Sequence, residues 1–322
     1  MLFKKPASLS GILDLVKPLE QSDIFLPSGK RIPEKIISLD GPRFSTPSSI
    51  TFISKKNPPS VYKSLNPAFA FSEMELGITQ FPYLAISSVH EAIRLVLEEN
   101  RNNFARLKTG KSYGAIHSSA TVEGKVEKGA RVGAGCFIGH HSLIRKGTVL
   151  EPNVTIMENC EIGSDCFIQS GAVIGASGFG FYQFEGEIRH MPHPAGVRIG
   201  NRVWIGANTV IAAGVLNPTV VENDCKLDSH VQIAHNVFLG PYAMIASQSG
   251  IAGSTSIGSR LLMGGASSIA GHLTLGDEVT VAARTGVTKN LPDKALMAGY
   301  PAQPLKKWKR QQIYLRQKAE DR

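Results

Sequence analysis

A branched or long aliphatic residue occupies every sixth position between Val221 and Val287. The series is Val221, Leu227, Ile233, Leu239, Ile245, Ile251, Ile257, Met263, Ile269, Leu275, Val281 and Val287. An α-helix repeats about every 3.6 residues and a strand about every 2, so neither element alone produces this period. A period of six is typical of a parallel β-helix, in which each hexapeptide forms one side of a coil. This stretch is therefore predicted to be a mainly β solenoid.

The same period is present upstream, where the segment from Thr121 divides into hexapeptides that each end in an aliphatic residue. Those residues are Val126, Val132, Ile138, Ile144, Leu150, Ile156, Ile162, Ile168 and Ile174, and the series resumes at Ile199, Ile205 and Ile211. Three hexapeptides make one triangular coil, with aliphatic side chains inside and glycine, asparagine and aspartate expected at corners that need a positive φ. One coil cannot bury its own inward side chains, so stacking of coils must supply the stability.

Residues 1–113 lack the period and are predicted to form a small N-terminal α/β domain. Ser8–Val16 has the pattern of a short helix, while Lys35–Leu39 and Ile50–Ile53 have the pattern of strands. Ser88-Val89-His90-Glu91 has the pattern of a capping box, in which Ser88 begins a second helix. A polar stretch from Glu98 to Tyr113 is predicted to link this domain to the repeats.

Residues 114–288 form the predicted β-helix domain. The period breaks at residues 176–197, a segment rich in glycine, aromatic residues and histidine. It is predicted to leave the scaffold as an extruded loop, and such loops often carry function. A smaller irregularity is expected at Leu216–Val220. Residues 289–322 form a C-terminal extension that ends in a short basic helix.

Composition limits the expected location and partners. The N-terminus has no signal-peptide apolar core and no stretch reaches the roughly 18–20 apolar residues of a membrane span, so a cytoplasmic protein is expected. The net charge is +9, but aromatic residues are only 7% and do not alternate with basic ones. An acidic protein or a phosphorylated partner fits this charge at least as well as nucleic acid. The four cysteines show no metal-ligand spacing and are expected to be reduced.

His235 and His272 are the candidate catalytic residues. Each lies two or three positions past an inward aliphatic residue, so both side chains should face outward. They are 37 residues apart, which corresponds to two coils and one residue. Because coils stack at roughly 4.8 Å, the imidazoles should lie on one side of the prism about 10 Å apart. An extended acyl-thioester arm fits along that ridge. An imidazole is the usual general base for an amine that attacks a thioester, with a backbone N–H at Gly253 or Gly271 as the candidate oxyanion donor.

Several motifs resemble those of the UDP-3-O-acylglucosamine N-acyltransferases of lipid A biosynthesis, the LpxD family. They are Gln232–Val237, Met263–Ser267, Gly271-His272, Gly178–Phe181, Val197–Gly200 and Gly299–Pro304. The resemblance covers most of residues 112–310, and Ile50-Thr51-Phe52 extends it to the N-terminal uridine-binding domain of that family. It implies a left-handed β-helix, against the usual right-handed crossover, and a homotrimer.

The resemblance also implies the reaction, which is transfer of a 3-hydroxyacyl chain from acyl carrier protein to the 2-amine of a UDP-3-O-acylglucosamine. No cofactor or metal is implied, since the donor is acyl-phosphopantetheine on the carrier. His235 would be the general base, and His272 would assist at the oxyanion or on the carrier side. The implied substrate-binding residues are Phe52, which stacks on uracil, and Asn57, Gly178, Phe179, Gly180, Asp228 and Asn236. The implied carrier-binding residues are Lys289, Lys306, Lys307, Lys309 and Arg310.

This chain departs from the motifs of the family at several positions. Ala212 and Ala213 replace an Asp-Arg pair, Ser177 replaces an aspartate, and Trp204 replaces a glutamate. In the implied uracil pocket, Lys55 and Pro58 stand at asparagine and tyrosine positions, with Asn57, Pro58 and Tyr62 as candidate shifted replacements. Two alternatives therefore stay open. Trp204 and the altered pocket favour a hexapeptide acyltransferase for acetyl-CoA or another nucleotide amino sugar, and the two alanines favour a non-catalytic trimeric paralogue.

Overall fold

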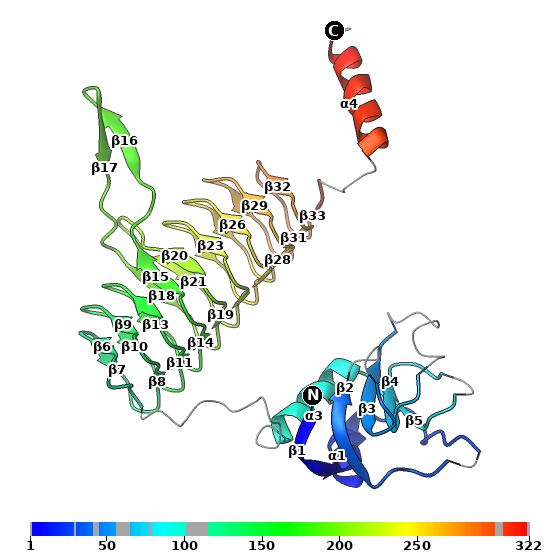
Figure 1. The fold of residues 1–322 in the computed structure, drawn as a ribbon. Helices are drawn as coiled ribbons and strands as arrows, with labels where there is room; N and C mark the ends of the chain where they lie inside the picture. The colour runs from blue at the N-terminus through cyan, green and yellow to red at the C-terminus, as the bar shows by residue number, and fades with distance from the viewer. Residues whose placement is uncertain are drawn as a thin grey trace. The chain divides into compact units, whose positions relative to one another are not determined.

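The computed structural model describes residues 2–28, 30–40, 45–55, 65–76, 79–100, 115–299 and 305–320. The chain forms two compact units, residues 1–112 and residues 113–322 (Figure 1). Some sequence predictions fall outside the described residues, namely those on Asn57, Pro58, Tyr62 and residues 300–304. The side chains of Lys306 and Lys307 also lie outside the description.

In its described residues the first unit contains a five-stranded sheet and two α-helices. Its strands are β1 (Leu2–Ser8), β2 (Lys35–Asp40), β3 (Ser49–Ile53), β4 (Phe69–Ser72) and β5 (Tyr83–Ala85). They pair in the order β1-β2-β3-β4-β5, and only the β1–β2 pair is antiparallel. The helices are α1 (Leu9–Val16), followed by the 3₁₀ turn η1 (Lys17–Leu19), and α3 (Val89–Glu99).

Side-chain caps set the starts of both helices. The Ser8 hydroxyl accepts from the Gly11 N–H at the start of α1, and the Ser88 hydroxyl accepts from the Glu91 N–H at 3.2 Å at the start of α3. The prediction that Ser88 begins a helix is confirmed. The Glu91 carboxylate, however, binds Arg94 one turn further on, which replaces the reciprocal bond of a capping box.

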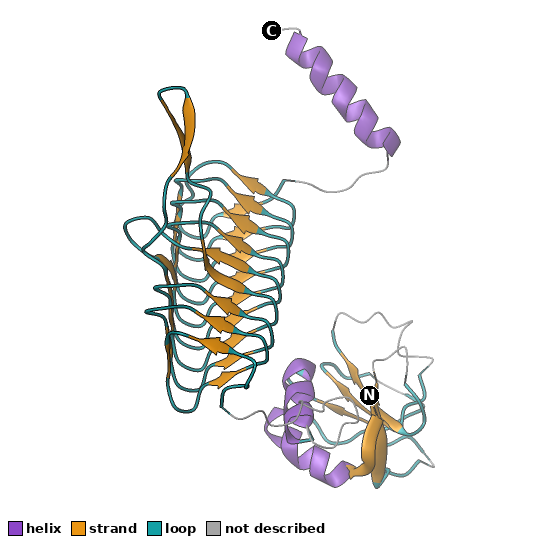
Figure 2. Ribbon diagram, turned by 60° about the vertical axis from the view of Figure 1, so that its left-hand side comes forward, coloured by secondary structure: helices purple, strands orange, loops and turns teal. Residues whose placement is uncertain are grey.

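The second unit is a parallel β-helix with three faces (Figure 2). Face 1 contains β6 (Thr121–Val122), β9 (Phe137–Ile138), β12 (Thr155–Ile156), β15 (Val173–Ala176), β20 (Val210–Ala212), β23 (Gln232–Ile233), β26 (Gly250–Ile251), β29 (Ser268–Ile269) and β32 (Gly286–Val287). Face 2 contains β7 (Lys125–Val126), β10 (Leu143–Ile144), β13 (Glu161–Ile162), β18 (Val197–Ile199), β21 (Thr219–Val221), β24 (Phe238–Leu239), β27 (Ser256–Ile257) and β30 (Thr274–Leu275). Face 3 contains β8 (Arg131–Val132), β11 (Val149–Leu150), β14 (Phe167–Ile168), β19 (Trp204–Ile205), β22 (Lys226–Leu227), β25 (Met244–Ile245), β28 (Leu262–Met263), β31 (Thr280–Val281) and β33 (Leu296–Met297).

The predicted inward residues form the core of this β-helix. Every member of the series from Val221 to Val287 is at most 3% exposed, and each stacks on its equivalent in the next coil. Burial of one such side chain contributes about 1.5–3 kcal/mol relative to exposure. The prediction of a mainly β protein with a parallel β-helix is confirmed, and its left-handed sense still rests on the resemblance.

The corners differ in part from the prediction. Asparagine, aspartate and glycine do adopt positive φ in the N-terminal coils, as at Asn153, Asp165 and Gly171. However, His141, Arg202 and His230 also have positive φ, and from Tyr242 onward all such corners are occupied by other residue types, such as Arg260 with φ near 60°. The expectation of asparagine, aspartate or glycine at these corners is wrong there, since the stacked coils hold side-chain-bearing residues in a conformation that isolated chains disfavour.

The segment predicted to leave the scaffold is a β-hairpin. It consists of β16 (Phe181–Phe184) paired antiparallel with β17 (Glu187–His190), and it projects from the side of the β-helix after β15 (Figure 1). A second irregularity precedes β21, where Val215–Pro218 bulge out of the coil. It begins one residue before the predicted Leu216–Val220 and ends earlier, because Thr219 and Val220 belong to β21. The C-terminal helix α4 spans Leu305–Glu320. Among the described helices, none has the length and apolar character needed to cross a membrane.

Candidate active site

His235 lies at the corner where the chain passes from face 1 to face 2, directly after β23. Its side chain is half-buried. Two glycines leave room for it, since a Cβ on Gly253 would lie 2.7 Å from its Cε1 and Nε2, and a Cβ on Gly178 would lie 2.7 Å from its Cβ. Gly253 belongs to the next coil and Gly178 to the start of the extruded segment. The imidazole is therefore enclosed by segments far apart in the sequence.

Asn236 determines which nitrogen of His235 carries the proton. The Oδ1 of Asn236 accepts from the Val215 N–H at 3.3 Å, and its Nδ2 donates to the Asn217 carbonyl at 3.0 Å. These two backbone groups fix the orientation of the amide, because an N–H can only donate and a carbonyl can only accept. The Nδ1 of His235, 3.2 Å from that Oδ1, must then carry the hydrogen. Nε2 is left with the lone pair and is the basic nitrogen of the neutral ring.

Three imidazoles and one hydroxyl gather around this corner. The rings of His193 and His235 have centroids 5.0 Å apart, and those of His190 and His193 are 5.7 Å apart. The Ser177 hydroxyl lies 3.2 Å from His190 Nε2 and 3.4 Å from His193 Nδ1. Burial, together with His235 and His190, lowers the pKa of His193. Sequence reasoning did not select His190 or His193, and the histidine content of the extruded segment was the only signal available.

The predicted second histidine, His272, lies on the same corner two coils further along. It is exposed and has φ of 60°. The strand register aligns Gln232, Gly250 and Ser268, so the residue equivalent to His235 in that coil is Gly271. His272 is equivalent to Asn236 instead, and its N–H donates to the Gly253 carbonyl at 3.0 Å.

A row of equivalent corner positions thus runs along the β-helix from His235. Gly253, Gly271 and Lys289 occupy the next three coils in this row, as the pairing of β29 with β32 shows. The glycines leave a track without side chains, and Lys289 is exposed at its far end. Within the part of the chain that the structure describes, the N–H groups of Gly253 and Gly271 have no acceptor. Both remain candidate oxyanion donors.

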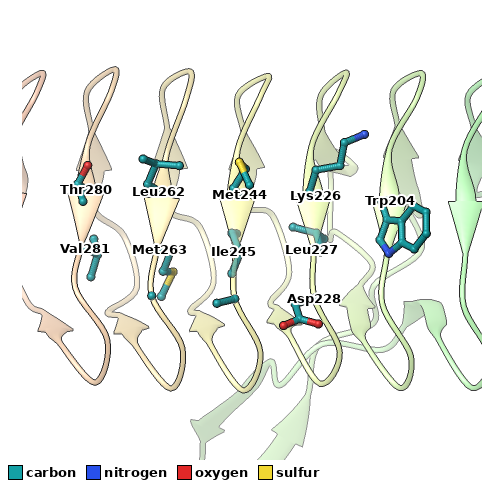
Figure 3. A pocket seen from close by; sticks show the side chains of 12 residues that line it. Trp204, Lys226, Leu227, Asp228, Met244, Ile245, Leu262, Met263, Thr280 and Val281 are labelled. Carbon is teal, nitrogen blue, oxygen red and sulfur yellow. The ribbon is translucent and has the colours of Figure 1, made fainter. Parts of the chain in front are cut away.

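Face 3 carries a separate apolar groove with a volume of about 710 Å³. Figure 3 shows its outward side chains in one row, one from each strand, formed by Trp204, Lys226, Met244, Leu262 and Thr280. Met244 is 55% exposed and Leu262 is 47% exposed. The Trp204 ring lies against Phe167 with centroids 4.4 Å apart.

The remaining predicted residues are placed as follows. Asp228 borders the groove, and its carboxylate accepts from the N–H groups of Ser229 at 2.7 Å and Ser247 at 3.1 Å. The Asp228 carboxylate therefore links two successive coils at their corner. Phe179 is 86% exposed at the base of the hairpin. Gly180 accepts from the Met191 N–H across the same base.

The other predicted residues are divided between the two units. Ala212 and Ala213 are buried at the end of β20, where Ala213 donates to the Ala176 carbonyl. The pairing of β20 with β23 makes Ala213 the equivalent of His235 in the preceding coil. Phe52 belongs to the first unit, where its half-buried ring stacks on Phe71 at 5.6 Å. Lys309 and Arg310 are exposed on α4. Among the described residues, no three histidine, cysteine, aspartate or glutamate side chains are placed to hold a metal ion.

Comparison with family models first gives the class of this β-helix. Residues 141–176 match the model described as bacterial transferase hexapeptide (six repeats), and residues 196–233 match the hexapeptide repeat of succinyl-transferase. The second unit thus contains the hexapeptide repeats found in bacterial transferases.

Three curated relatives then narrow the comparison, since each bears the name UDP-3-O-acylglucosamine N-acyltransferase. The chain is 41% identical over 160 residues to a probable mitochondrial enzyme of Arabidopsis thaliana, covering 49% of this chain and 52% of the relative. It is 47% identical over 156 residues to the protein of Rickettsia akari, covering 48% and 45%. For Bordetella parapertussis the identity is 41% over 229 residues, covering 63% of each chain. The resemblance seen in the sequence motifs is confirmed, and the chain spans about half the length of the first two of these relatives.

Solved structures give the same fold. UDP-N-acetylglucosamine acyltransferase from Francisella novicida superposes with a TM-score of 0.51 at 26% identity, covering 56% of this chain and 65% of that one. LpxA from Acinetobacter baumannii superposes with a TM-score of 0.53 at 23% identity, covering 58% and 72%. These similarities support the β-helix architecture independently of the repeat period.

Proposed function

We propose that the protein is an N-acyltransferase that moves a 3-hydroxyacyl chain from acyl carrier protein to the 2-amine of a UDP-3-O-acylglucosamine. The observation that carries this proposal is the fixed tautomer of His235. Its Nδ1 hydrogen is held by Asn236, so the Nε2 lone pair faces the glycine track beside Gly253. The names of the relatives supply the acceptor and the reaction.

The chemistry requires a base at this position. An amine that attacks a thioester carbonyl becomes positively charged and must lose a proton before the tetrahedral intermediate can give an amide. His235 Nε2 takes that proton, while the N–H of Gly253 or Gly271 donates to the oxyanion. Collapse of the intermediate breaks the carbon–sulfur bond, and His235 gives the proton that it took from the amine to the departing thiolate. The residues of the chain supply each of these roles without a resident cofactor.

The corner track supports a carrier-bound donor. Lys289 is three coils from His235, which corresponds to roughly 14 Å at the spacing of stacked strands. An extended phosphopantetheine arm reaches over such a distance, with its thioester at His235 and its phosphate at the Lys289 ammonium. The exposed basic residues Lys309 and Arg310 on α4 then offer a surface for the acidic carrier protein.

We further infer that the protein is a homotrimer in the cytoplasm. Trp204, Met244 and Leu262 form an exposed apolar row on face 3, and such rows on a folded protein commonly mark a contact surface. Packing of this face against a different face of a second copy is a heterologous contact, which generates a closed ring when the rotation permits. We propose three copies around one axis, because the family that the chain resembles forms homotrimers.

The decisive experiment is an assay of the purified chain with 3-hydroxyacyl carrier protein and UDP-3-O-acylglucosamine. We expect amide formation, and we expect His235→Ala to reduce kcat by about 10²–10⁴-fold, as is typical for loss of a general base. Lys289→Ala should instead raise KM for the carrier with little change in kcat. Absence of transfer, or a rate unaffected by His235→Ala, overturns the proposal. Transfer from acetyl-CoA in place of the carrier would point to a different donor.

A further inference from the structure

His193 lies in the extruded segment after the hairpin, and backbone contacts on both sides hold it beside His235. Met191 donates to the Gly180 carbonyl at 2.6 Å, which closes the base of the hairpin. On the other side, the Pro194 carbonyl accepts from Asn159 Nδ2 at 3.1 Å, and Ala195 donates to the Gly214 carbonyl at 3.0 Å. The backbone around His193 is therefore tied to the β-helix immediately before β18.

Two glycines make room for the ring of His193. A Cβ on Gly178 would lie 2.6 Å from its Nε2, and a Cβ on Gly180 would lie 2.7 Å from its Cε1. The same Cβ on Gly178 would lie 2.7 Å from His235 Cβ. The ring thus fills the space between the extruded segment and the catalytic corner, and it packs against His235 with the two planes inclined by 60°.

Hydrogen bonding favours the neutral form of His193. Its Nδ1 lies near the Ser177 hydroxyl, which can either donate to it or accept from it. Its Nε2 is buried and has no hydrogen-bond partner among the described residues. A protonated ring would place a charged N–H at that buried position, which costs more than leaving a neutral nitrogen unpaired. The titratable groups that face this ring are His190 on β17 and His235 at the corner.

We propose that His193 is a positioning residue for His235. Its neutral ring packs against the catalytic imidazole and keeps that imidazole from rotating out of the corner. This inference rests on the proposed acyl transfer, in which His235 is the base. The ring of His193 blocks one side of His235, while Asn236 holds Nδ1 and Gly253 leaves Nε2 open. Because His193 is neutral at neutral pH, the charge that His235 gains from the amine meets no like charge next to it. At acid pH His193 becomes protonated, and its positive charge then repels the charge that His235 gains.

The activity test uses two substitutions of His193 and one matched control. His193→Ala removes the ring that packs against His235. We expect kcat to fall about 10–100-fold and KM for both substrates to stay within about twofold of the wild-type value, as for a misplaced catalytic group. His193→Leu keeps a side chain of similar volume without a titratable nitrogen, and it should retain kcat within about fivefold. His141→Asn, at an exposed corner with φ of 59°, should leave the rate unchanged. Equal losses in the alanine and leucine variants, or a normal rate for His193→Ala, would overturn the proposal.

The pH dependence separates positioning from a structural role. Burial lowers the pKa of His193, so protonation of His193 should contribute to the acid limb of the wild-type kcat/KM profile, and this contribution should be absent in His193→Leu. Histidines labelled with ¹³C at Cε1 give the same information without substrate. In the wild type the His235 signal should shift when His193 takes up its proton, and this step should be absent in His193→Leu.

The NMR titration also separates failure of this inference from failure of the proposed function. If the wild type transfers no acyl group but the His235 signal changes as expected, only the proposed reaction is wrong. If transfer occurs and the His235 signal is the same in both proteins, the role of His193 is wrong.

Discussion

The Nδ1 atom of His235 lies 3.2 Å from the Oδ1 atom of Asn236, and the Asn236 amide is itself held by the Val215 N–H and the Asn217 carbonyl. Asn236 also donates its own N–H to the Thr219 hydroxyl at 2.8 Å. The bulge before β21 and the first residue of that strand thus orient Asn236, and Asn236 in turn orients the base. An irregularity in the repeat is therefore part of the candidate active site.

The first prediction concerns this amide. Asn236→Gly keeps the positive φ but removes the acceptor for His235, so we expect kcat to fall about 10–100-fold. Asn236→Asp keeps an oxygen beside Nδ1 and should retain more activity than the glycine variant. Steady-state kinetics of both proteins check this order. An Asn236→Gly enzyme with a wild-type kcat would show that the tautomer is fixed in another way.

The second prediction tests the room beside the base. In Gly253→Ala the new methyl group would lie 2.7 Å from His235 Nε2, so the imidazole must move and kcat should drop by about 10²-fold. Gly250→Ala, three residues earlier on β26, meets no atom within 4 Å and serves as the matched control. Thermal unfolding should show both proteins folded. Comparable activity in the two variants would contradict the enclosure of His235.

The third prediction concerns face 3. A double substitution of Met244→Asp and Leu262→Asp places two charges in the exposed apolar row, where burial against a second copy would be costly. Mass measurement in solution should change from about three subunits to one. Ser256→Asp, on face 2, should leave the assembly intact. A wild-type mass near one subunit, or a trimer that survives the double substitution, would show that face 3 is not the interface.

The fourth prediction addresses stability. Thr209 is fully buried, donates its hydroxyl to the Asp228 carbonyl at 2.7 Å, and accepts from the Val231 N–H at 3.1 Å. Thr209→Val leaves both backbone groups unpaired, so the free energy of unfolding should fall by about 1–3 kcal/mol. Thr274→Val, at an exposed position on face 2, should change it by less than about 0.5 kcal/mol. Denaturant unfolding of the two variants provides the comparison.

The fifth prediction follows from the buried thiols. Burial raises the pKa of Cys160 and of Cys225 to about 11, from an ordinary value of 9.0. Because the folded-state pKa is the higher one, this stability is fully present below about pH 9 and is lost as pH rises toward 11. A shift of two units corresponds to roughly 3 kcal/mol for each thiol. The native protein should resist iodoacetamide at pH 8, while the denatured chain reacts at all four cysteines. Rapid alkylation of Cys160 or Cys225 in the folded protein would contradict this prediction.

The repeat period was sufficient to predict the β-helix and its core. Each inward position is set by local spacing alone, because one aliphatic residue in six must face the interior of every coil, whatever the neighbouring coils contain. The same reasoning placed His235 and His272 on one outward corner, since both follow strands of face 1. The helix starts at Ser8 and Ser88 were also predictable, because a cap is a contact over three residues.

The surroundings of His235 could not be predicted in this way. His193 approaches it from an extruded segment 42 residues earlier, and Gly253 approaches it from the following coil. The spacing of 37 residues already contains a one-residue offset, and the strand register shows its consequence, since His272 is equivalent to Asn236 and Gly271 to His235. Sequence alone therefore determined which residues face inward and which lie on the corner. Only the tertiary structure decided which of them meet, because those contacts join segments whose separation follows no period.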